Sequence, residues 1–298
     1  SVEASLAKLL EAKEATPPAR PVIAREGLGA LAYGLLLFGE FTLAQEMLAE
    51  LHSGVREEGT AEALGDAADA IVCAGRGDAA GAQQALERAA LSAADGPYAA
   101  HRHYVRMVCA LAGGDPGEGL RAYDDWTRLT ADAPLPTRFV QQVECQRVIL
   151  IAATGDIGTA RAVLDDAFIQ ERRTGPRPFL HTLYAARLDA AAGRYDRVNL
   201  ATDPHGPLGE AHLSGMQTRY APAVLALRGT ALFENGDIEG AHIAFARAVR
   251  RAIEIQEFFA LVAAETPQFR EWLLNADGSS LGSALDPSIV VPVIAALT

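Results

Sequence analysis

The stretch "GDIGTARAVLDDA" at residues 155–167 returns in altered form as "GDIEGAHIAFARA" at residues 236–248. Both begin with Gly-Asp-Ile, and both place alanine at the fifth position after the glycine, a large apolar residue at the ninth and alanine at the twelfth. Positions three and four residues apart lie on one face of a helix. The spacing therefore predicts a helix with a packing face of small and large residues, and not a catalytic motif.

The glycine that opens these stretches recurs along the 298-residue chain at intervals of 38, 37, 41, 38 and 43 residues. The anchor residues are Gly39, Gly77, Gly114, Gly155, Gly193 and Gly236. The fifth residues after them are Ala44, Ala82, Gly119, Ala160, Val198 and Ala241. The ninth residues are Leu48, Leu86, Tyr123, Leu164, Thr202 and Phe245. The fifth unit departs from the pattern, because "ATDPHGPLG" at 201–209 interrupts its second helix.

Each unit has the features of a helical hairpin. About 16 residues before each glycine have helical periodicity, as in Leu28, Leu31, Leu35 and Phe38. The glycine tolerates the left-handed conformation that ends a helix, and the acidic residue after it can cap the next helix. One hairpin cannot bury its own apolar face, so successive hairpins stack into a solenoid. We therefore predict an all-α fold.

The pattern resembles the tetratricopeptide repeat, whose consensus is "LG..Y...G.Y..A...F..A". The first unit matches that consensus at Leu31, Leu35, Gly39, Phe41, Ala44 and Leu48. The resemblance implies a right-handed superhelix of about six to seven antiparallel helical hairpins, elongated beyond the usual 34 residues. We expect a partial hairpin or linker over 1–19, the repeat array over 20–255, and a capping helix with a turn-rich exit over 256–298.

Composition restricts the function classes. The net charge of −12, from 38 acidic and 26 basic residues, argues against direct contact with nucleic acid. Cys73, Cys109 and Cys145 lie in apolar helical runs without a C-x-x-C pair, so we expect buried free thiols. The lysines Lys8 and Lys13 follow no glycine-rich loop, so no nucleotide cofactor is predicted. Without a signal peptide or a membrane-spanning stretch, we expect a cytoplasmic protein.

The stretch "AIEIQEFFALVAAETPQFREWLL" at 252–274 resembles the end of the helical sensor domain in LuxR-type, ATP-dependent bacterial activators related to the maltose regulator. In that family a helix-turn-helix domain follows and often opens "LT-x-R-E", whereas this chain stops at "AALT". The resemblance implies that this chain is the sensor domain of a transcriptional regulator.

Motifs for catalysis or metal binding have little support in the sequence. The "GSSLG" motif at 278–282 lacks the strand before it and the histidine after it that a nucleophile elbow needs. His101 and His103 are two residues apart, which on a helix points them in nearly opposite directions and disfavours a shared metal. The acidic pairs at 124–125 and 165–166 are typical of solvated helix faces. We predict neither an enzyme nor a metal site.

Polar side chains on the first helices of successive units are the candidate binding residues, because solenoids bind ligands on the concave surface that such helices line. They are Arg102, Arg106, Gln142, Arg147, His181, Tyr184, Arg187 and Arg228. A small-molecule effector or a protein partner is expected there, and self-association stays open. Two alternatives remain: a protein–protein scaffold unrelated to transcription, and side chains that only form hydrogen bonds between repeats and solvate the groove.

Overall fold

The computed structural model describes residues 21–38, 41–54, 60–75, 78–92, 99–131, 135, 137–169, 178–209, 213, 219–255 and 266–275. This part of the chain holds thirteen α-helices and no strand, so the predicted all-α class is confirmed. The helices are α2 (Pro21–Phe38), α3 (Phe41–Ser53), α4 (Thr60–Gly75), α5 (Ala79–Ser92), α6 (Ala99–Ala112), α7 (Pro116–Thr130), α8 (Thr137–Ala153), α9 (Ile157–Ala167), α11 (Phe179–Ala191), α12 (Tyr195–Thr202), α13 (Ala221–Glu234), α14 (Ile238–Glu254) and α16 (Pro267–Asn275).

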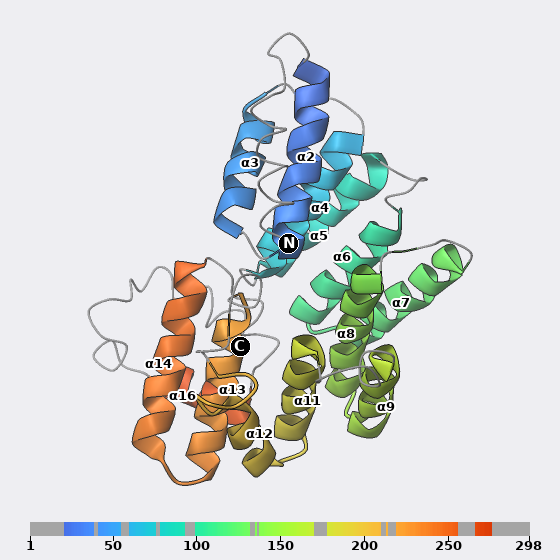
Figure 1. Ribbon diagram of the computed structural model, residues 1–298. Coiled ribbons are helices and arrows are strands. Elements are labelled where there is room, and N and C mark those ends of the chain that lie inside the picture. The colour runs from blue at the N-terminus through green and yellow to red at the C-terminus, as the bar shows by residue number, and fades with distance from the viewer. Residues whose placement is uncertain are drawn as a thin grey trace.

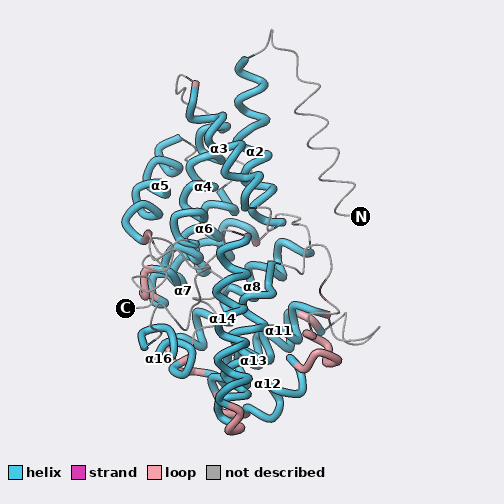
Figure 2. Tube along the Cα trace, turned by 90° about the vertical axis from the view of Figure 1, so that its left-hand side faces the viewer, coloured by secondary structure: helices cyan, strands magenta, loops and turns pink. Residues whose placement is uncertain are grey.

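Consecutive helices pack as pairs: α2 with α3, α4 with α5, α6 with α7, α8 with α9, α11 with α12 and α13 with α14. The first helix of each pair also contacts the first helix of the next pair. Figure 1 shows these pairs following one another along a curved path. Figure 2 shows the stack from α2 and α3 at one end to α12 and α13 at the other. The arrangement is compatible with a helical-repeat fold.

The turns between paired helices have the predicted chemistry. Gly114, Gly155, Gly193 and Gly236 have φ values between 69° and 91°, in the left-handed region that favours glycine. The aspartates that follow three of them, Asp115, Asp156 and Asp237, accept a hydrogen bond from a backbone N–H of the next helix, each at 2.9 Å. Gly39 and Gly77 lie outside the described residues.

The predicted packing positions are buried in every unit, both at the fifth and at the ninth residue after the glycine. In the third unit the fifth residue is Gly119, and the neighbouring helix approaches it so closely that alanine would not fit. A Cβ atom on Gly119 would lie 2.4 Å from the side chain of Leu150 in α8. The irregular fifth unit is confirmed, since α12 is eight residues long and ends at Thr202. Small residues at these positions therefore bring the helices together.

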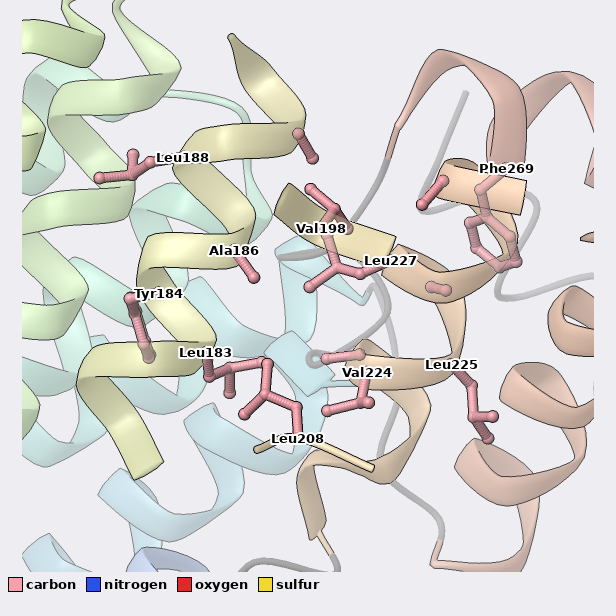
Figure 3. Close-up of a cluster of buried hydrophobic side chains, with 14 of the residues drawn as sticks. Leu183, Tyr184, Ala186, Leu188, Val198, Leu208, Val224, Leu225, Leu227 and Phe269 are labelled. Atoms are coloured by element: carbon pink, nitrogen blue, oxygen red, sulfur yellow. The ribbon is translucent and has the colours of Figure 1, made fainter. Parts of the chain in front are cut away.

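The largest hydrophobic cluster runs through α8, α9, α11, α12, α13, α14 and α16. In Figure 3, Leu183 of α11 lies close to Leu208 and Val224, whereas Leu188 extends from the opposite side of the same helix. Helix α16 joins this cluster through Phe269 and Trp272, whose rings lie 5.3 and 5.5 Å from that of Phe245. These contacts hold α16 against the last hairpin.

Three sequence expectations fall outside the described residues. They are the partial hairpin over 1–19, the "GSSLG" motif and the end of the chain after residue 275. Within 252–274, α14 ends at Glu254 and α16 begins at Pro267, and the segment between them is described only at Ile255 and Thr266.

Candidate functional site

A cavity of about 450 Å³ lies among α8, α11, α13 and the first residues of α16, with contributions from α6 and α12. Its volume is within the usual range for small-molecule sites. Most of its wall is aliphatic, from Leu111, Val148, Ile149, Leu188 and Leu227. The polar lining consists of Tyr184, Arg187, Tyr195, Thr266 and Gln268. We refer to this space as the Arg187 cavity.

Among the described residues that line the cavity, Arg187 is the only charged one, and none of them is a carboxylate. Its side chain is only 9% exposed, and its Nε atom is fully enclosed without a hydrogen-bond partner. Within the described part of the chain, no ion pair neutralises the guanidinium. Because a buried charge normally requires an opposite charge or several hydrogen bonds, this arginine is under-compensated in the empty cavity.

Tyr184 supports the guanidinium from one side. The central carbon of the Arg187 guanidinium lies 4.8 Å from the centroid of the Tyr184 ring, which is a cation–π contact. Burial raises the pKa of the Tyr184 hydroxyl well above its usual value, so this group stays neutral. Burial also raises the pKa of the nearby Cys145 thiol, although the charge of Arg187 acts in the opposite direction. Neither neighbour therefore supplies a negative charge.

The start of α16 closes another part of the cavity. The hydroxyls of Thr266 and Thr230 are 2.6 Å apart, which ties this segment to α13. The Nε2 group of Gln268 donates to the hydroxyl of Tyr195 at 3.4 Å and also to Glu234. The Oε1 atom of Gln268 is buried without a partner. The cavity thus joins the repeat array to the C-terminal helix.

Arg106, one of the predicted groove residues, is held by acidic residues of α7. It donates to Glu118 at 2.5 Å and to Asp125 at 2.8 Å, and these hydrogen bonds lower the pKa of both carboxyls. Its Nη1 atom is also 3.1 Å from Nδ1 of His103. Arg102 lies half-buried one turn earlier on α6. Arg106 therefore links α6 and α7, the two helices of one hairpin.

Arg147 and His181 also bond to other helices. Arg147 lies over the ring of Tyr123 and donates to its hydroxyl at 3.0 Å. His181 is only 2% exposed and is 2.9 Å from Asp165 of α9. These side chains stabilise the contacts between adjacent hairpins.

Arg228 donates to the carbonyl of Thr202 at 2.9 Å, which holds α13 against the end of α12. Gln142 is half-buried on α8. Of the eight predicted residues, the structure thus brings Tyr184 and Arg187 together at the cavity and places the other six elsewhere along the array.

Sequence reasoning missed Tyr195, Thr266 and Gln268, because they lie in a second helix and in the segment after the repeats. Pro267, which directly precedes Gln268, is a helix-start signal that could have drawn attention to this segment. The aliphatic wall was not predicted either, since leucine and valine on a helix indicate a core equally well.

A second hollow, of about 610 Å³, lies against the opposite face of α11. Arg161 and Asp189 line it, but they are already paired at 2.5 Å, and Arg194 binds the same carboxylate at 2.7 Å. Arg161 is therefore compensated within the protein, in contrast to Arg187, and Arg197, which also lines this hollow, is exposed.

The three cysteines are free thiols; Cys109 and Cys145 are buried as expected, whereas Cys73 is half-buried. Burial raises the pKa of Cys109 to about 12, which keeps this thiol protonated and unreactive. The described residues contain no group of three or more histidine, cysteine, aspartate or glutamate side chains suited to a metal ion.

A scan against protein-family models and a search of curated proteins found no match to this chain. Among the described helices, none has both the length and the apolar character that crossing a bilayer requires. The function must therefore be inferred from the site itself.

Proposed function

We propose that this chain is a sensory module that binds a small-molecule effector in the Arg187 cavity. The observation that carries the proposal is the buried guanidinium of Arg187, which faces an aliphatic cavity without an acidic partner among the described residues. A ligand that supplies the missing charge or hydrogen bonds would stabilise the protein. The proposed activity is binding, without catalysis.

In this proposal the array is a right-handed superhelix of six to seven hairpins, and it belongs to a LuxR-type transcriptional regulator. The repeat pattern and the resemblance of residues 252–274 to the exit of that sensor domain support this assignment. Effector binding would act through α16, because α11 and the first residues of α16 line the same cavity. An effector with different affinities for two positions of α16 would shift the equilibrium between them.

The alternative is a protein–protein scaffold that binds a partner segment along the first helices. That function would depend on exposed polar side chains in the groove. Arg106 and Arg147 are bonded to neighbouring side chains, and His181 is enclosed. A concave, partly open site with mixed polar and apolar walls fits a small molecule better than an extended peptide.

Thermal unfolding of the chain against sugars, organic acids, nucleotides and amino acids tests the proposal. A ligand at 100 times its dissociation constant should stabilise the folded state by about 2.7 kcal/mol. Ala191→Phe should abolish the effect, because Ala191 lines the cavity at its exposed rim. Ala162→Phe on the exposed face of α9 is the matched control and should retain it.

Two results would contradict the proposal. One is the absence of a stabilising ligand across the panel, together with a protein partner whose binding changes when Arg102 or Gln142 is substituted. The other is a ligand that stabilises the Ala191→Phe variant as strongly as the original chain. Either result would show that the binding site lies on another surface of the protein.

A further inference from the structure

We infer that the ligand of the Arg187 cavity is a small organic monocarboxylate with an apolar body. This inference rests on the proposed function, since it assigns a chemical class to the effector of the same site. It follows from three properties of the cavity: its charge, the geometry of its cation and the nature of its walls.

The charge of the cavity specifies a monoanion. Arg187 contributes one positive charge, and the described residues that line the cavity contribute no other. A ligand with one negative charge neutralises it. A dicarboxylate or a phosphate dianion would place a second negative charge beside Leu188 and Leu227 with no cation to compensate it.

The geometry of the cation favours a carboxylate. The Nε atom of Arg187 is enclosed, which leaves the two terminal nitrogens of the guanidinium as the donors for a ligand in the cavity. Two parallel N–H groups match the two oxygens of a planar carboxylate, and the resulting pair is both strong and directional. The ring of Tyr184 holds the guanidinium from one side before the ligand arrives, which reduces the ordering cost of binding.

The walls specify the rest of the ligand. Val148, Ile149, Leu188 and Leu227, which line the cavity, have purely hydrocarbon side chains. Each methylene that such a wall removes from water strengthens binding by about fourfold, which is the equivalent of about 0.8 kcal/mol. A longer aliphatic or aromatic carboxylate should therefore bind more tightly than acetate until the cavity is full.

Titration calorimetry with matched acid and amide pairs tests this assignment. The probes are acetate, hexanoate, octanoate and phenylacetate, each paired with its primary amide, together with succinate and inorganic phosphate. The original chain should bind the acids at least about tenfold more tightly than the amides, because the charged hydrogen bonds are lost with the amide. Affinity should rise from acetate to hexanoate, and succinate and phosphate should bind more weakly than hexanoate.

The variants separate the cation from the cavity. Arg187→Met keeps the length of the side chain and removes its charge, and it should bind the amides at least as well as the acids. Arg121→Met is the matched control, since Arg121 is exposed on α7 and paired with Glu118. It removes the same charge and should leave the preference for acids unchanged. Circular dichroism establishes that both variants are folded.

The outcomes distinguish the two proposals. If neutral ligands bind and Ala191→Phe abolishes their binding, while no carboxylate binds, the sensory function stands and the assignment of a carboxylate is overturned. If acids bind equally well to Arg187→Met, the role of Arg187 is overturned. If succinate or phosphate binds more tightly than hexanoate, the assignment of a monocarboxylate with an apolar body is overturned. If neither the carboxylates nor any compound of the broader panel binds, both proposals fail.

Discussion

The guanidinium of Arg187 lies over the ring of Tyr184, three residues earlier on the same face of α11, with its central carbon 4.8 Å from the ring centroid. A cation–π contact of this kind contributes about 2 kcal/mol when it is shielded from water. The desolvation of an unpaired ion costs several kcal/mol. The contact therefore offsets only part of the cost of burying Arg187 in the empty cavity.

We expect Arg187→Met to raise the stability of the ligand-free protein by roughly 1 kcal/mol, because the aliphatic replacement removes an uncompensated charge. Arg187→Lys retains the charge and loses the planar contact with Tyr184, so it should be less stable than the original chain. Urea unfolding of the three proteins measures the difference. A loss of stability in Arg187→Met would mean that the cation–π contact outweighs desolvation.

A second prediction concerns Gly229, where α13 approaches α14. A Cβ atom at this position would lie 2.4 Å from two ring carbons of Phe245, so Gly229→Ala should cost about 1–3 kcal/mol of stability. Gly34 in α2 has open space around it, and Gly34→Ala should instead stabilise its helix by up to about 1 kcal/mol. Thermal unfolding of both variants should show shifts of opposite sign. Stabilisation of both variants would show that helix propensity outweighs packing at Gly229, and destabilisation of both would contradict the prediction for Gly34.

A third prediction concerns the cap of α14. The carboxylate of Asp237 accepts a hydrogen bond from the backbone N–H of Gly240 at 2.9 Å, and Asp237→Ala should cost about 1 kcal/mol. Asn is an equally good capping residue, so Asp237→Asn should retain most of the stability. Chemical unfolding of the two variants checks this, and equal losses would indicate that charge, and not the hydrogen bond, is responsible.

A fourth prediction concerns pH. Burial lowers the pKa of His101, which is 4.4 Å from the ring of Phe139 and hydrogen-bonded to the Tyr33 hydroxyl at 3.1 Å. Burial is also the largest of the effects that lower the pKa of His103. Since the unfolded chain then binds protons more readily than the folded one, stability should fall as the pH drops below about 6.5.

His101→Phe should reduce this loss, because an aromatic ring at the same place carries no proton. The measurement is the urea midpoint of the original chain and the variant at pH values of about 7.5 and 5.5. An identical decrease in both proteins would assign the pH dependence to other groups.

Much of the fold could be predicted because its cause is local. The left-handed glycines, the capping aspartates and the small residue five positions after each glycine act within one hairpin, so their spacing in the sequence carries the information. Gly155, Asp156 and Ala160 have the conformations and burial that the motif predicts. The break in the fifth unit was also visible, since Pro204 and Gly206 follow soon after Thr202.

The candidate site was only partly predictable. Arg106 and Arg187 looked equivalent in sequence, because each is an arginine on the first helix of a hairpin. They differ in their surroundings: acidic residues of α7 reach Arg106, and none of the described residues around the cavity does the same for Arg187. Gln268 had no periodic signal at all, because it follows the repeats.

The sequence by itself determined the helices, their turns and their pairing into hairpins, because these depend on residues close together in the chain. Only the tertiary structure decided which polar side chain remains uncompensated. Charge compensation depends on groups far apart in sequence, such as Arg187 on α11 and Gln268 on α16, which the stacking of hairpins brings to the same cavity.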